Sequence, residues 1–271
     1  EKVNLTMEPT LVDGGIYDIS TIGNDLAGNN LTSSTIQQVL FDVTPPSIIA
    51  SFPAPTSFVR TSAISYNLSE TLSEGKVVWE RTGGEIDASS PHEVRLSGLE
   101  LSMGEHNEIV LTNAPNLVSG SVYSISFEGI DPATNNASGM TIESVTFDNM
   151  PPLLTIKTSN DLLAINEPRL TYTISENSIS GIVTFEQTSG NTDPNSPHEV
   201  VLVESELSKG EHAGAVFSNN PTLVDGGIYR ISFTATDAAG NEAETVRING
   251  ILFDSITVSY THLRAHETEA D

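Results

Sequence analysis

The fold is indicated by a short alternating stretch, Tyr229-Arg230-Ile231-Ser232-Phe233. Its large apolar residues stand at every second position, with polar residues between them. Successive side chains of a β-strand point to opposite faces, so this period predicts a strand with one buried and one exposed face. The stretch Tyr123-Ser124-Ile125-Ser126-Phe127 has the same pattern 106 positions earlier.

The offset of 106 residues recurs along the chain and defines a repeat. The stretch Ser90-Pro91-His92-Glu93-Val94 returns unchanged at 196–200, and the Pro-Pro pair at 45–46 returns at 151–152. Phe41-Asp42 likewise returns at the two equivalent positions. The predicted domains are the second half of a repeat over 1–46, complete repeats over 47–152 and 153–256, and a tail over 257–271.

Each complete repeat is predicted to be a β-sandwich. In the first, runs with strand character are separated by clusters of Gly, Pro, Asn and Ser, and helical periodicity is absent from the sequence of the repeats. Seven short strands in about 100 residues predict an all-β fold of tandem, seven-stranded immunoglobulin-like sandwiches. The Pro-Pro connectors favour a rod-like array. The expected strands are 47–52, 61–69, 75–81, 93–101, 107–113, 121–130 and 140–148.

A tyrosine opens the sixth expected strand of every repeat, at Tyr17, Tyr123 and Tyr229. Each follows a leucine and a glycine-containing turn. The arrangement resembles the tyrosine corner of immunoglobulin-like domains, in which the tyrosine hydroxyl bonds back to the backbone. We therefore expect these tyrosines to fix the connection before the strand.

Two further motifs resemble bacterial immunoglobulin-like repeats of large surface adhesins and exported multidomain proteins. One is Ala235-Thr236-Asp237-Ala238-Ala239-Gly240-Asn241, and the other is Phe41-Asp42-Val43-Thr44-Pro45-Pro46. The middle repeat departs from the first motif, because Thr134 replaces the glycine. The resemblance covers residues 1–256 and implies stalk or adhesion modules, some of which bind calcium between domains.

The last residues break the repeat. Residues 257–271 differ in composition, and their first part resembles the translation of a DNA-sequencing adapter. We expect this tail not to belong to the natural protein, and the chain to be a fragment of a longer one.

Charge and composition limit the partners of the chain. It carries 36 Asp and Glu residues against 11 Lys and Arg, for a net charge of −25, and contains no cysteine. Nucleic acid and anionic membranes would be repelled, because phosphate binding requires clustered basic residues. No apolar run approaches the roughly 20 residues of a membrane-spanning helix. Disulfides and thiolate metal sites are excluded.

Acidic residues are predicted to gather where consecutive repeats join. In an immunoglobulin-like sandwich, the loops after the second and sixth strands lie at the pole that receives the preceding domain. Asp42, Glu70 and Asp131 should therefore converge at the first junction. The equivalent residues Asp148, Glu176 and Asp237 should converge at the second.

These carboxylates have two interpretations. Oxygen ligands from loops, without His or Cys, suit calcium, and one ion per junction would neutralise their repulsion. Alternatively, the Asp and Glu residues act separately, as turn-capping acceptors of backbone N–H groups. The sequence leaves both open.

Other polar and aromatic residues are less promising. His92 and His106 begin different strands of a hairpin, so we expect separate surface positions and no shared metal. Trp79 would serve as a sugar-stacking platform if it were exposed, although a tryptophan on the third strand is more often part of the core. No nucleophile elbow or glycine-rich phosphate loop is present.

The sequence therefore predicts a structural or adhesive stalk and not an enzyme. Its location would be extracellular or at the cell surface, with signal and anchor outside this stretch. Expected partners are neighbouring repeats and a host-surface glycan or protein. The alternatives are a ligand-binding immunoglobulin-like module, or accessory repeats of an exported hydrolase whose catalytic domain lies elsewhere.

Overall fold

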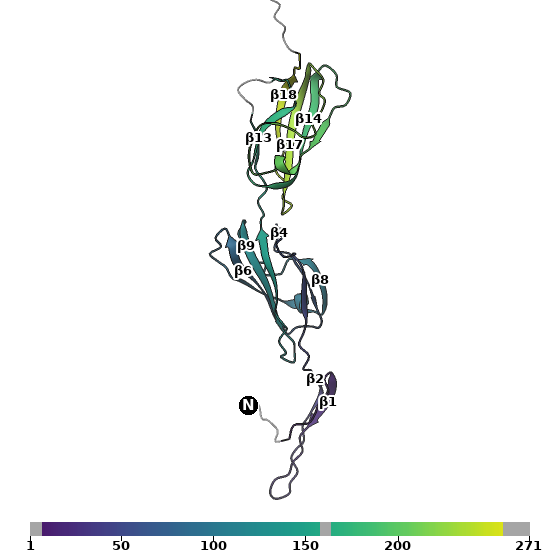
Figure 1. Cartoon of the computed structure of the whole chain (residues 1–271). Coiled ribbons are helices and arrows are strands. Elements are labelled where there is room, and N and C mark those ends of the chain that lie inside the picture. Colours follow the sequence, from purple (N-terminus) through teal and green to yellow (C-terminus); the bar gives the residue numbers. More distant parts are fainter. Residues whose placement is uncertain (1–6, 158–163, 257–271) are drawn as a thin grey trace, which may run out of the picture. The chain divides into compact units, whose positions relative to one another are not determined.

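The computed structural model describes residues 7–157 and 164–256 (Figure 1). The chain divides into two compact units, Glu1–Asp148 and Asn149–Asp271. The predicted repeat boundaries after residues 46, 152 and 256 stay predictions, and the predicted tail lies outside the described residues.

The first unit begins with a hairpin of two antiparallel strands, β1 (Gly15–Ser20) and β2 (Thr35–Phe41). Tyr17 lies opposite Val39, and a bulge follows it. The hairpin corresponds to the last two strands of a complete repeat.

A complete sandwich follows in the same unit. One sheet has the strand order β4-β10-β9-β6-β7 and the other β3-β5-β8. The pairs are antiparallel except β4 with β10, which is parallel. The strands are β3 (Ile48–Phe52), β4 (Phe58–Val59), β5 (Ile64–Leu68), β6 (Glu74–Gly84), β7 (His92–Arg95), β8 (Gly104–Ile109), β9 (Ser121–Ile130) and β10 (Met140–Phe147).

The second unit repeats this topology. Its sheets have the orders β12-β18-β17-β14-β15 and β11-β13-β16. The strands are β11 (Leu154–Lys157), β12 (Ala164–Ile165), β13 (Arg169–Ile174), β14 (Ser178–Gly190), β15 (His198–Val201), β16 (Gly210–Val216), β17 (Gly227–Asp237) and β18 (Val246–Phe253).

The alternating stretches lie where the sequence predicts. In β9 the side chains of Tyr123, Ile125 and Phe127 are buried, and the residues between them are partly exposed. The equivalent residues of β17 are buried in the same way. Each forms a core with side chains from the facing three-stranded sheet, such as Tyr66 and Tyr172. The fold is therefore all-β, with tandem immunoglobulin-like sandwiches.

Two details differ from the predicted strands of residues 47–152. The two-residue strand β4 is additional to the seven expected. The strand expected over 93–101 ends at Arg95, and a short 3₁₀-helix, η1 (Gly98–Leu101), follows it. The chain turns there because the Glu100 carboxylate accepts from the backbone N–H of Ser97 (2.7 Å) and of Thr112 (2.7 Å). In the second unit, Glu206 binds Val203 and Ser218 in the same way, beside η2 (Glu204–Glu206).

Candidate metal-binding site

Three acidic side chains lie together in the first unit. Asp42 follows β2, Glu70 comes soon after β5, and Asp131 directly follows β9. One carboxylate oxygen from each lies within 4.8 Å of the others. Asp131 is buried, whereas Asp42 and Glu70 are partly exposed. Metal binding at this acidic group stays a prediction.

Asp131 is held by the turn that follows β9. Its Oδ1 accepts from the backbone N–H of Asn135 (2.8 Å), and its Oδ2 accepts from Nδ2 of the same residue (2.8 Å). The Asn135 amide also donates to the backbone carbonyl of Asp42 (3.2 Å). Asn135 therefore links two members of the acidic group.

The same turn occurs in the other repeats. Asp25 accepts from the backbone N–H of Ala27 and Asn29, and Asp237 accepts from that of Ala239 and Asn241, all between 2.8 and 2.9 Å. Turn capping thus accounts for an aspartate at this position in every repeat. Asp42 and Glu70 are therefore the more informative residues for a metal site, because neither is needed to form this turn.

The surroundings of Glu70 disfavour the ionised form of its carboxylate. Its pKa is raised from the ordinary value of 4.5 by partial burial and then by the charges of Asp42, Asp131 and Asp13. Asp13 is a fourth carboxylate that the sequence analysis missed. It accepts from the Val43 N–H (2.8 Å) and from the Thr44 hydroxyl (2.6 Å), so its pKa is lowered.

This arrangement fits a hard divalent cation. Closely spaced carboxylates raise one another's pKa because like charges repel, and a cation between them would remove that cost. Calcium takes six to eight oxygen ligands in flexible geometry, and the acidic group supplies carboxylates from separate loops. No histidine or cysteine is needed.

The second predicted group is divided between the two units. Asp148 is the last residue of the first unit, and its carboxylate accepts from the Ser119 hydroxyl (2.8 Å). Glu176 follows β13, and Asp237 ends β17, in the second unit. A metal site built from these three residues stays a prediction.

The turn after β9 contains a strained residue that offers a test. Thr134 has a φ of 74°, in the left-handed region that β-branched residues avoid, and Gly240 has a φ of 84° at the equivalent position. Thr134→Gly should raise the free energy of unfolding of the first unit by about 1 kcal/mol. Gly240→Thr should lower that of the second unit by a similar amount, since nothing lies within 4 Å of the added Cβ. Urea unfolding would measure both, and a neutral Gly240→Thr would contradict the prediction.

A buried cluster that the sequence analysis missed lies at the tyrosine corner of each sandwich. The Tyr123 hydroxyl accepts from the Val118 N–H (3.0 Å), which confirms the predicted corner, and donates to Asp87 Oδ2 (2.6 Å). The same oxygen lies 2.6 Å from His92 Nε2, and Oδ1 accepts from Ser89 N–H (2.9 Å). We call Asp87, His92 and Tyr123 the corner cluster.

The corner cluster recurs in the second unit. Tyr229 accepts from Val224 N–H (2.9 Å) and donates to Asp193 (2.7 Å), which also binds His198 (2.7 Å). In the hairpin, Tyr17 accepts from Val12 N–H (2.8 Å). The signal available in the sequence was the Asp five positions before each Ser-Pro-His histidine.

Hydrogen bonding fixes the charge of this cluster. Burial alone would raise the pKa of Asp87, but bonds from Tyr123, His92 and Ser89 outweigh it and hold the pKa at about 2. The pKa of Asp193 is lowered for the same reasons. Burial, with the bond to Asp193, raises the pKa of Tyr229 to about 12. The aspartates are therefore ionised acceptors, and His92 donates through Nε2.

The expectation of surface positions for the two histidines was wrong, whereas the core alternative for Trp79 is confirmed. His92 and His106 are not simple surface residues, because His92 belongs to the corner cluster and His106 stacks on Tyr66 with ring centroids 4.5 Å apart. Trp79 is fully buried and packs edge-on against Tyr123, with centroids 6.0 Å apart. It cannot stack on a sugar.

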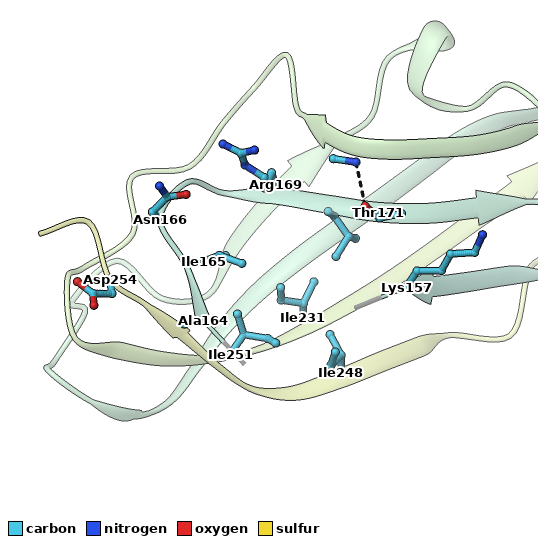
Figure 2. A pocket seen from close by; sticks show the side chains of 12 residues that line it. Lys157, Ala164, Ile165, Asn166, Arg169, Thr171, Ile231, Ile248, Ile251 and Asp254 are labelled. Carbon is cyan, nitrogen blue, oxygen red and sulfur yellow. Dashed lines mark hydrogen bonds between the residues drawn. The ribbon is translucent and has the colours of Figure 1, made fainter. Parts of the chain in front are cut away.

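A hollow of about 440 Å³ lies in the second unit, lined by Ile231, Ile248 and Ile251 on one side and by Thr171 and Arg169 on another (Figure 2). Lys157 and Ala164 flank it, and the six residues between them in sequence lie outside the described part. No function is proposed for this hollow.

Comparison with known proteins gives fold-level similarities. No family model matches the chain, and neither does any curated protein. The FN1-FN3 domains of chicken CNTN1 are 11% identical, with a TM-score of 0.37, over 89% of this chain and 77% of that one. A tetra-tandem repeat in the extending region of a large adhesion protein is 16% identical (TM-score 0.30), over 88% and 56%. Fibronectin(III)-like modules of Clostridium thermocellum CbhA are 12% identical (TM-score 0.30), over 80% and 100%.

The fold assignment therefore depends on the strand order and the two cores, not on these similarities. Within the described residues, no helix is long and apolar enough to cross a membrane.

Proposed function

We propose that the chain is a non-catalytic segment of structural and adhesive repeats, which spaces or presents a binding region of a secreted or cell-surface protein. The observation that supports this is the duplication of a whole sandwich together with its internal polar contacts. The corner cluster and the Glu100 contacts recur 106 residues later as Asp193, His198, Tyr229 and Glu206. These polar side chains hold the fold together in both copies, and repetition of a domain serves spacing and multivalent contact.

Calcium is part of the proposal. Asp42, Glu70 and Asp131 would hold the ion in the first unit, with Asp148, Glu176 and Asp237 as the equivalent set. A bound cation would neutralise the repulsion at Glu70 and tie loops from different strands to one point. Its role would be to stabilise, with no reaction at the site.

Thermal unfolding with excess calcium or with EGTA tests the calcium site. Calcium should raise the melting midpoint by several degrees at neutral pH, because an ion that binds only the folded state stabilises it. Glu70 has a raised pKa in the folded state, so its repulsion is absent below about pH 4.5 and develops as the pH rises. The calcium effect should therefore fade in acid. An equal midpoint in calcium and EGTA at pH 7 would refute calcium binding.

Matched variants separate the site from general charge effects. Glu70→Gln with Glu176→Gln should abolish the calcium-dependent shift. Glu143→Gln, which removes one charge on β10 outside the acidic group, should retain it. Magnesium in place of calcium should act weakly, since it requires a tighter octahedral shell.

A further inference from the structure

The outer face of the five-stranded sheet in the second unit carries an apolar patch. Ile182 on β14 lies opposite Val201 on β15, and these side chains are 37% and 59% exposed. Val203, two positions after Val201, is 38% exposed, and Ile179, near the start of β14, is 67% exposed. We call these four residues the β14–β15 patch. Gathered apolar side chains at the surface often mark a place where another molecule binds.

The first unit is polar at the equivalent positions, which are Ser73, Lys76, Arg95 and Ser97. Lys76 lies opposite Arg95, as Ile182 lies opposite Val201 in the second unit. Charged side chains are a common protection for an edge strand such as β7, and β15 has lost one of them. The same fold forms with both sets of side chains, so the fold does not require the apolar set.

The patch lies on a sandwich that has both of its sheets. The second unit contains the same two strand orders as the complete sandwich of the first. Val183 and Val200, next to Ile182 and Val201 in sequence, are fully buried between the sheets. Because successive side chains of a strand point to opposite faces, Ile182 and Val201 point away from the three-stranded sheet. That sheet therefore cannot cover them.

Two carboxylates border the patch. Glu199 precedes Val201 by two positions on β15, so both side chains project from the same face. Glu204 directly follows Val203 and lines a hollow of about 520 Å³ together with Ile179. Within residues 7–157 and 164–256, neither Glu199 nor Glu204 forms an ion pair.

The first unit shows how a carboxylate at the position of Glu199 is paired. Its equivalent there is Glu93, whose Oε1 lies 3.5 Å from Lys76 Nζ. In the second unit Ile182 replaces that lysine, so Glu199 stands beside apolar side chains without the cation. A surface complementary to the patch therefore combines aliphatic groups with a positive charge.

The backbone of β15 favours binding on the face of the sheet over addition of a strand at its edge. The Val201 carbonyl accepts from Asn219 Nδ2 (3.3 Å), and the Val203 N–H donates to the Glu206 carboxylate (2.8 Å). Both groups would have to be freed before a further strand could pair there.

We propose that the β14–β15 patch is a binding surface for a partner polypeptide whose contact surface combines aliphatic side chains with lysine or arginine. The aliphatic side chains cover Ile182 and Val201, and the cation pairs with Glu199 as Lys76 pairs with Glu93. A second copy of the chain fits poorly, because its net charge of −25 would meet an acidic border. The interaction does not depend on calcium, since no residue of the two acidic groups takes part.

The probe is a short peptide that repeats Val-Lys-Val, with blocked termini, added to the full chain at physiological salt. In an extended chain this repeat places both residue types on each face. Backbone amide NMR should show perturbation of residues 179–182 and 199–204, whereas the equivalent residues 73–76 and 93–98 stay unchanged. No perturbation at millimolar peptide, or equal perturbation of both units, would overturn the proposal.

Exchange of side chains between the two units tests the patch directly. Ile182→Lys with Val201→Arg gives the second unit the pair found in the first and should weaken peptide binding about tenfold or more. Lys76→Ile with Arg95→Val should create a second site on the first unit. Both proteins should keep the melting temperature of the parent, because each pair already occurs on this fold. Failure of either binding result would overturn the proposal.

Charge variants test the requirement for a cation. Glu199→Gln should weaken binding, whereas Glu80→Gln, which removes one exposed charge from β6, should not. A peptide with glutamate in place of lysine should not bind, and equal binding of both peptides would refute the charge pairing. A dimer of the chain in sedimentation that Ile182→Lys dissociates, and that the lysine peptide does not displace, would assign the patch to a second copy and also refute the proposal.

Discussion

Trp79→Ala should lower the free energy of unfolding of the first sandwich by about 3–5 kcal/mol, the usual cost of truncating a large buried aromatic residue. Trp79 is fully buried on β6, which lies between β9 and β7 in its sheet, with its ring against Tyr123. Its removal leaves a cavity between the sheets that the surrounding backbone cannot fill. Calorimetry should show one of two transitions at a much lower temperature, with the other unchanged.

Comparison with the second unit provides the control. Phe185 occupies the equivalent buried position on β14, and Phe185→Ala should move the other transition. Trp79→Phe should cost much less than alanine, because the second unit already accommodates phenylalanine there. The Trp79 Nε1 also has no hydrogen-bond partner, so its loss removes an unpaired buried donor. If Trp79→Ala and Phe185→Ala lowered the temperature of the same calorimetric transition, the assignment of one transition to each sandwich would be wrong.

The repeat and the period-two pattern were sufficient to predict the fold, because both reflect the core directly. Tyr123, Ile125 and Phe127 alternate in sequence since they alternate between core and surface. The end of the strand expected over 93–101 was missed for a different reason. Its backbone turns at η1 because of a long-range bond between Glu100 and Thr112, which no local pattern records.

For the polar residues, too, some groupings could be predicted from the sequence and others could not. Asp42, Glu70 and Asp131 could be grouped from the expected strand order, because each follows a strand end. Asp87 and His92 could not, since their partner Tyr123 lies more than 30 positions away in sequence and on another strand. The repeated Ser-Pro-His, with an aspartate five positions before each histidine, was visible, but no local pattern showed that this aspartate is buried against a tyrosine of another strand.

Asp87→Ala should destabilise the first sandwich strongly through the corner cluster. The carboxylate accepts from Tyr123 and His92 and from the backbone of Ser89. Each buried donor left without its acceptor costs about 1–3 kcal/mol. Tyr123 is fully buried, and the His92 side chain is 13% exposed. Urea unfolding at pH 7 should show the loss, and Glu93→Ala, an exposed change on β7, should stay within about 0.5 kcal/mol of the parent. An Asp87→Ala protein as stable as the Glu93→Ala protein would refute the role of the cluster.

The pH dependence identifies ionisation of Asp87 as the cause. Its pKa falls from an ordinary 3.8 to about 2 on folding, so the carboxylate stabilises the folded state above about pH 3.8, and the benefit is lost as the pH falls to about 2. Burial and the bond to Asp87 raise the pKa of Tyr123 above its ordinary 10.0, so its contribution is present below pH 10 and is lost above it. The stability difference between the parent and Asp87→Asn should therefore shrink as the pH falls below about 4. A difference that persists unchanged at pH 2 would mean that the cluster acts by shape alone, without the charge on Asp87.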